Sequence, residues 1–63
     1  MDEFKTFIMN SIKEEDEDRQ KYKAWAEKAR SMGMHKSAYF LKEIAHEELT
    51  HKMALEKILH MMK

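Results

Sequence analysis

Apolar residues recur through the first half of the chain at steps of three, four and seven positions. They are Phe4, Ile8, Ile12, Tyr22, Ala26 and Ala29. This spacing places side chains on one face of an α-helix that packs against other helices. We therefore predict a helix over about residues 2–31.

A second apolar stripe occupies the other half of the chain. It comprises Met34, Ala38, Leu41, Ile44 or Ala45, Leu55, Ile58 or Leu59, and Met62. The spacing predicts a second helix over about residues 36–62. Gly33, the one glycine, lies between the stripes, where a helix commonly ends on a residue in the left-handed conformation. The predicted fold class is all-α, and residues 1–63 form one domain, an antiparallel two-helix hairpin that turns around Gly33.

Composition agrees with this fold and excludes several classes of protein. The chain has no proline, as expected for long helices. Its 12 Lys and Arg balance 12 Asp and Glu, which argues against the strongly basic surface typical of nucleic-acid-binding proteins. No apolar run approaches the ~20 residues of a membrane span. The early acidic residues Asp2 and Glu3 do not resemble the start of a secretory signal. We expect a cytoplasmic protein without nucleic-acid or membrane partners.

Small size makes additional stabilisation necessary. Domains of about 60 residues bury only about 60% of their unfolded surface and commonly depend on disulfides, metals or partner chains. The sequence has 63 residues and no cysteine, which excludes disulfides and thiolate metal sites. The remaining stabilisers are a metal held by His, Asp and Glu, or other copies of the chain.

Ionisable residues interrupt both stripes near their middles. Glu15 continues the first stripe, and Glu48 and His51 lie within the second. Their E-x-x-H spacing corresponds to about 300° of helical rotation, so both side chains leave the helix on one side and can share a metal ion. Because Glu15 lies 18 residues before Gly33 and Glu48 lies 15 after it, the two carboxylates are expected to face each other.

One hairpin would supply two carboxylates and one imidazole, which is half of a di-metal site. Two hairpins paired through their apolar faces would form a ferritin-like four-helix bundle with four Glu and two His in its core. Four negative charges balance two divalent cations, and this arrangement is that of di-iron and di-manganese carboxylate proteins. Oxygen-rich ligation with one imidazole per metal favours iron or manganese over structural zinc.

An ordered set of residues resembles the rubrerythrin branch of the ferritin-like superfamily. The set, which spans more than half of the chain, is Glu15, Tyr22, Ala26, Ala29, Gly33, Ala38, Ala45, Glu48 and His51. The resemblance implies that Glu15, Glu48 and His51 are metal ligands, with Glu48 bridging the two metals. It also implies that Tyr22 hydrogen-bonds a ligand carboxylate.

The sequence departs from rubrerythrins in length and in cysteine content. Rubrerythrins carry two such halves and a four-cysteine iron site that passes electrons to the di-iron centre. A single half without cysteine is more similar to encapsulated ferritins, in which hairpins dimerise to complete a ferroxidase site. Asp18 stands where rubrerythrins usually have a small residue, and three roles remain open for it: an extra ligand, a group on the path of incoming iron, or a solvated side chain.

These features predict a di-iron oxidoreductase with its site formed across a homodimer or a higher even-numbered oligomer. The resemblance implies two iron ions per dimer, with manganese as an alternative, and assigns the chemistry to Glu15, Glu48, His51 and Tyr22. Ferroxidase activity, reduction of dioxygen or hydrogen peroxide, and metal storage remain open. Peroxidase turnover would need an external electron donor. The alternative from another class is a metal-free helical-hairpin scaffold or protein-interaction module, with its buried carboxylates protonated or paired.

The remaining charged and aromatic residues are interpreted as surface or contact residues. Apart from Glu15, the run from Glu14 to Asp18, with the cations that follow it, is typical of a solvated helical face. Glu43 and His46 form a second E-x-x-H pair, which diverges from Glu48 and is predicted to lie on the surface. Trp25, Tyr39 and Phe40 lie partly off the main stripes, and together they indicate contacts beyond the dimer.

Overall fold

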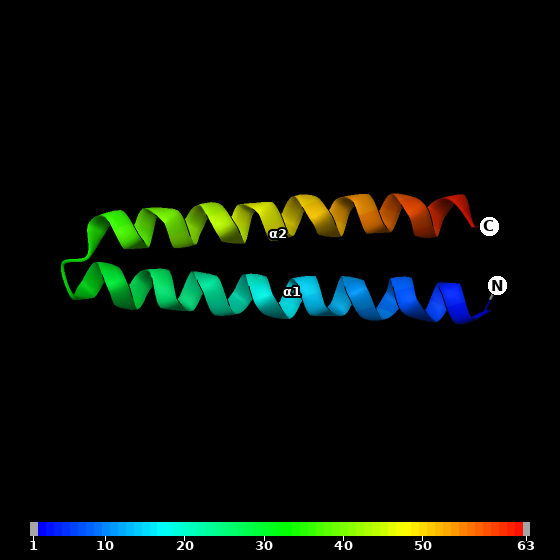
Figure 1. Ribbon diagram of the computed structural model, residues 1–63, viewed down its shortest axis with the longest axis horizontal. Helices are drawn as coiled ribbons and strands as arrows, with labels where there is room; N and C mark the ends of the chain where they lie inside the picture. The colour runs from blue at the N-terminus through cyan, green and yellow to red at the C-terminus, as the bar shows by residue number, and fades with distance from the viewer. Residues whose placement is uncertain (1, 63) are drawn as a thin grey trace.

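The structure is a computed structural model that describes residues 2–62, so Met1 and Lys63, the ends of the predicted single hairpin, lie outside the described residues. Two antiparallel helices run side by side along the molecule, α1 over Asp2–Ser31 and α2 over His35–Met61 (Figure 1). No strand occurs among residues 2–62, which confirms the all-α prediction. The second helix begins and ends one residue earlier than predicted. Within the same residues, neither helix combines the length and apolarity needed to cross a membrane.

The reversal between the helices is a glycine-terminated cap. Gly33 has a φ of +79°, and its N–H donates to the Arg30 carbonyl at 3.0 Å. The Met34 N–H donates to the Ala29 carbonyl at 2.9 Å. This pair of hydrogen bonds is the Schellman motif, which satisfies carbonyls at a helix C-terminus and requires a left-handed residue. The predicted left-handed conformation of Gly33 is confirmed.

The contact between the helices is built mainly from alanine. Buried apolar side chains within residues 2–62 are Ile8, Ala26, Ala29, Ala38 and Ala45. Small side chains let two helices approach closely, but each buries little apolar area. The Cα trace measures 48 × 14 × 10 Å, so the hairpin is a two-helix rod with a thin core. A core of this size gives little stability to a single chain.

Large apolar side chains are exposed in the single hairpin. Phe7 is 61% exposed, Trp25 55% and Phe40 63%. Phe40 packs edge-to-face on Tyr39, with 5.5 Å between the ring centres, while Lys28 lies over the Trp25 ring at 4.4 Å. Exposed aromatic surface on so small a chain is typical of a protein that packs against another chain.

Candidate metal centre

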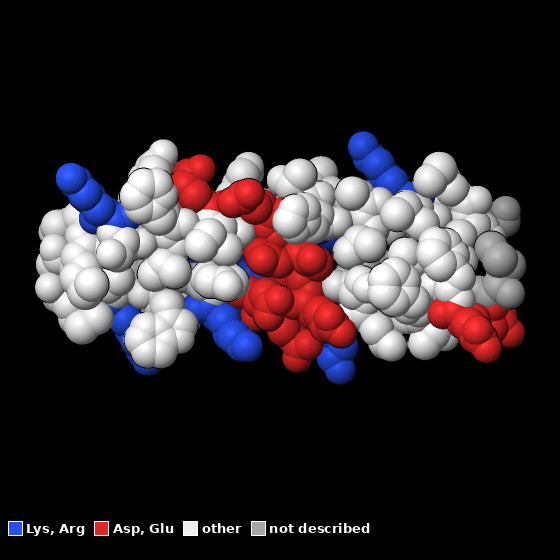
Figure 2. Space-filling view, viewed as in Figure 1, with Lys and Arg blue, Asp and Glu red and all other residues white. Residues whose placement is uncertain are grey.

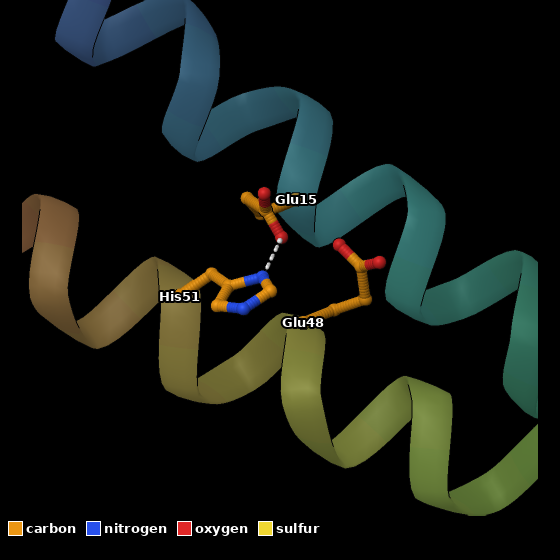
Figure 3. Close-up of side chains that lie close together, drawn as sticks. All are labelled: Glu15, Glu48 and His51. Carbon is orange, nitrogen blue, oxygen red and sulfur yellow. Dashed lines mark ion pairs between the residues drawn. The ribbon is translucent and has the colours of Figure 1, made fainter.

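The middle of the hairpin brings together the three side chains that interrupt the apolar stripes. Glu15 extends from α1 toward Glu48 and His51 of α2, and all three meet between the helices (Figure 3). One potential ligand atom from each residue lies within 4.8 Å of the others. The register set by the turn therefore makes the two carboxylates face each other, as their distances from Gly33 in the sequence predict.

Glu15 carries an unsatisfied oxygen. Its side chain is 24% exposed, yet Oε2 is buried and has no hydrogen-bond donor among the described residues. The nearest cationic candidate is Nδ1 of His51, 3.5 Å away. A buried carboxylate oxygen without a donor is unfavourable, and a metal cation would satisfy it. The residues present therefore fit a cation bound between Glu15, Glu48 and His51.

Glu48 holds its proton more strongly than an ordinary glutamate. The facing carboxyl group of Glu15 is the largest cause, and together with partial burial and the negative charge of Asp18 it raises the pKa of Glu48 to about 6. His51 acts in the opposite direction. A proton thus relieves the repulsion that two facing carboxylates create, and a metal ion would relieve it more fully.

Acidic side chains form a band across the hairpin. In the view of Figure 2 this band lies at mid-length, with mostly uncharged residues on both sides. Mid-length is also the level at which Glu15 and Glu48 lie along their helices. Concentrated negative charge attracts cations to this part of the surface.

Tyr22 and Asp18 lie on α1 and are not members of the three-residue group. Both side chains are half-buried. The Tyr22 hydroxyl makes no hydrogen bond to a described residue, so its predicted bond to a ligand carboxylate stays a prediction. Asp18 acts on Glu48 through its charge, but its carboxylate is outside the group of close ligand atoms.

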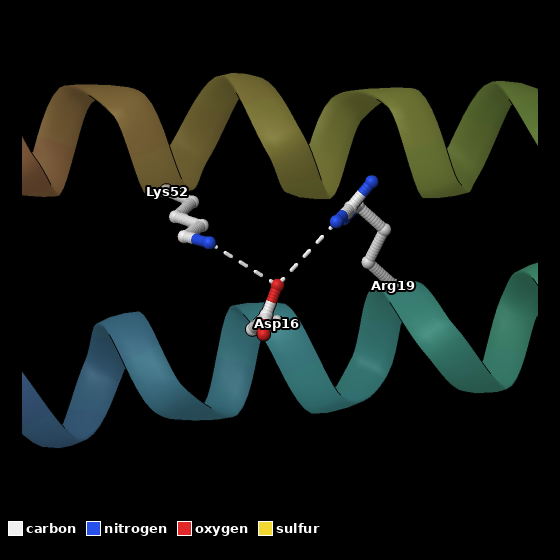
Figure 4. A network of polar contacts seen from close by, with 3 residues as sticks. All are labelled: Asp16, Arg19 and Lys52. Atoms are coloured by element: carbon white, nitrogen blue, oxygen red, sulfur yellow. Dashed lines mark hydrogen bonds and ion pairs between the residues drawn. The ribbon is translucent and has the colours of Figure 1, made fainter.

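A polar network beside the group was not predicted from the sequence. Lys52 of α2 donates a hydrogen bond to Asp16 of α1 at 3.2 Å, and Arg19 lies 3.5 Å from the same carboxylate oxygen (Figure 4). These contacts lower the pKa of Asp16, with the Lys52 hydrogen bond as the largest cause. The Asp16 side chain is still 45% exposed and pairs with Arg19 along α1, so what the sequence did not predict is its contact with Lys52 across the hairpin. Asp16 directly follows Glu15, and Lys52 directly follows His51. This adjacency was the one feature of the sequence that could have indicated a contact between Asp16 and Lys52.

Comparison with known proteins agrees with the geometry. The rubrerythrin family model matches residues 6–63, a span that contains Glu15, Glu48 and His51. No curated protein and no solved structure matches the chain. The family match implies a di-iron carboxylate protein that binds iron. With nearly its whole length matched, the chain belongs to the rubrerythrin family.

Proposed function

We propose that this chain is half of a di-iron oxidoreductase whose site is completed by a second copy, and that it oxidises ferrous iron or reduces dioxygen or hydrogen peroxide. The observation that carries the proposal is the convergence of Glu15, Glu48 and His51 around an unsatisfied carboxylate oxygen. Within one hairpin this group offers two carboxylates and one imidazole, which is half of a ferritin-like di-metal site.

A second copy would complete both the site and the core. Two hairpins would contribute four carboxylates and two imidazoles, and the four negative charges would balance two ferrous ions. The same pairing would cover apolar side chains such as Phe4, which belongs to the first stripe and is exposed in one hairpin. The thin alanine contact within each hairpin supports this arrangement, because it leaves most of the potential apolar contact to a partner.

The residues of the centre have distinct tasks in this proposal. Glu15, Glu48 and His51 would hold the iron, which supplies paired one-electron chemistry toward dioxygen or hydrogen peroxide. Glu48 would release its proton when metal binds, because ligation needs the carboxylate form. Tyr22 would orient a ligand carboxylate. Since the chain has no cysteine, electrons for peroxide turnover would come from an external donor.

Replacing Glu48 tests the site directly. We expect Glu48→Ala to abolish binding of ferrous iron under anaerobic conditions and to weaken the dimer, because it removes one of the three side chains whose ligand atoms meet at the centre. Glu56→Gln is the matched control, since Glu56 is an exposed carboxylate on the same helix and lies outside the group. Full iron occupancy of Glu48→Ala would contradict the assignment.

The oxidant distinguishes the possible activities. A ferroxidase would oxidise ferrous iron rapidly with dioxygen and accumulate ferric product. A peroxidase would consume hydrogen peroxide over many turnovers only when an electron donor is supplied. Stopped-flow absorbance with each oxidant, with and without a donor, separates these outcomes. Slow oxidation at the rate of free iron with both oxidants would contradict either activity.

A further inference from the structure

A groove separate from the candidate metal centre lies between the two helices. Its volume is about 360 Å³, and it contains none of Glu15, Glu48 and His51. We call it the cationic groove, and define it by Arg19, Lys23, Lys42 and His46 around a floor of Ala45 and Leu49. Figure 4 shows Arg19 of this groove. In that view α2 lies above α1, as in Figure 1, but the C-terminal half of α2 is on the left. The two figures therefore show opposite sides of the hairpin.

Positive charge dominates the lining of the groove. Arg19, Lys23 and Lys42 carry three positive charges, and the one carboxylate in the lining, Glu27, is held by Arg30 at 2.8 Å. Neither lysine forms a salt bridge with any residue in the described part of the chain. His46, an exposed residue from the second E-x-x-H pair, adds an imidazole. In a chain of zero formal net charge, this is a local excess of cations.

Arg19 retains hydrogen-bonding capacity inside the hairpin. One terminal nitrogen of its guanidinium lies 3.5 Å from Asp16, while the Nε donor is buried and has no acceptor among residues 2–62. A buried donor without an acceptor is unfavourable, and guanidinium groups bind anions through several nitrogens at once. The guanidinium of Arg19 therefore has an unused hydrogen-bond donor in addition to its contact with Asp16.

The floor of the groove is apolar. Ala45 is 5% exposed and Leu49 is half-buried, so a ligand can rest its uncharged part on them. The volume of about 360 Å³ falls within the range of ordinary small-molecule sites and far exceeds the volume of a phosphate ion. Three cations that line one groove suit a dianion with several acceptor oxygens better than a single carboxylate.

We propose that the cationic groove binds an organic phosphate monoester, with its phosphate held by Arg19, Lys23 and Lys42 and its organic part on Ala45 and Leu49. This site is independent of the di-iron proposal, because the two share no residue. It gives the chain a second ligand, recognised by charge and by an apolar floor.

Calorimetric titration of the full chain with adenosine monophosphate, inorganic phosphate and adenosine tests this site. We expect saturable binding of adenosine monophosphate, weaker binding of phosphate and none of adenosine. The double variant Lys23→Gln/Lys42→Gln should bind adenosine monophosphate at least roughly tenfold more weakly, which corresponds to about 1.4 kcal/mol. Lys13→Gln, at an exposed position of α1 outside the groove, should bind like the wild type.

Three outcomes would overturn the proposal. Equal affinity of the wild type and the double variant would show that the groove lysines do not hold the phosphate. Equal affinity for phosphate and adenosine monophosphate would show that the apolar floor does not bind the organic part of the ligand. If the wild type binds none of the three probes, the groove is not a phosphate-ester site. Loss of the oligomeric state in the double variant would then show that another copy of the chain fills the groove. Circular dichroism and native mass of each variant establish that it is folded.

Discussion

Glu48 is the residue at which burial, charge and metal binding meet. Its carboxyl group faces Glu15 across the helix contact and has a pKa of about 6, above the ordinary value of 4.5. In the metal-free protein the folded state therefore binds a proton that the unfolded chain releases more readily. The same residue that would hold iron makes the metal-free fold sensitive to pH.

The stability of the metal-free protein should fall as pH rises from ~5 to ~7. Because folding raises the pKa of Glu48, protonated Glu48 contributes to the free energy of unfolding. This contribution is fully present below the unfolded pKa of 4.5 and is lost as pH rises through about 6. Glu48→Gln, which keeps the shape without the charge, should flatten this dependence. Thermal melts in chelator across this range measure it, and an equally steep dependence in the variant would contradict the assignment to Glu48. The charges that act on Glu48 come from Glu15, Asp18 and His51.

Individual residues were predictable where spacing along the chain fixes them. Counting from Gly33 placed Glu15 opposite Glu48, and the E-x-x-H step placed His51 on the same side. The contact from Lys52 to Asp16 was not predictable, because periodicity does not show how far a flexible lysine reaches across to another helix. Whether a buried oxygen such as Oε2 of Glu15 lacks a hydrogen-bond donor was likewise not predictable, because it depends on the positions of all neighbouring side chains.

At the scale of the elements, the hairpin depends on its turn and on the small residues between the helices. Periodicity and the single glycine were sufficient to predict two helices and the reversal between them. Both ends of α2 differ by one residue from prediction, because caps depend on local hydrogen bonds rather than on the apolar stripe. The second helix has no side-chain cap at Met34, so the Schellman motif at Gly33 is the main defined feature of the turn.

Gly33→Ala should destabilise the protein by about 1 kcal/mol. A Cβ at this position would meet no atom within 4 Å, so the cost comes from the left-handed φ of +79° and not from a clash. Gly33→Asn should cost less, because asparagine tolerates this conformation better. Chemical denaturation at one fixed protein concentration measures both variants. Stability of Gly33→Ala equal to that of the wild type would contradict the role given to the turn.

The whole molecule is a 48 Å rod with a thin core and exposed aromatic side chains. The all-α class followed from the sequence. The solvent-exposed faces did not, because one stripe can pack against the neighbouring helix or against another chain. Phe4, on the first stripe, is 43% exposed in the single hairpin. The exposed apolar surface makes the stability of the hairpin depend on a partner chain, and the acidic centre makes it depend on a bound metal ion.

Removing metal should lower the melting temperature of the iron-loaded protein. In the proposed dimer four carboxylates cluster in the bundle core and repel one another without cations, so a chelator removes both the metal and its folding energy. Differential scanning calorimetry with and without chelator measures the shift. Identical melts, with metal loss verified by elemental analysis, would instead favour a metal-free scaffold.

Native mass spectrometry of protein purified anaerobically with ferrous iron tests the central claim most directly. The account predicts an even-numbered oligomer with one iron per chain, since two half-sites of Glu15, Glu48 and His51 would share two ions. Glu56→Gln should give the same spectrum as the wild type. A metal-free monomer would contradict the shared di-iron centre.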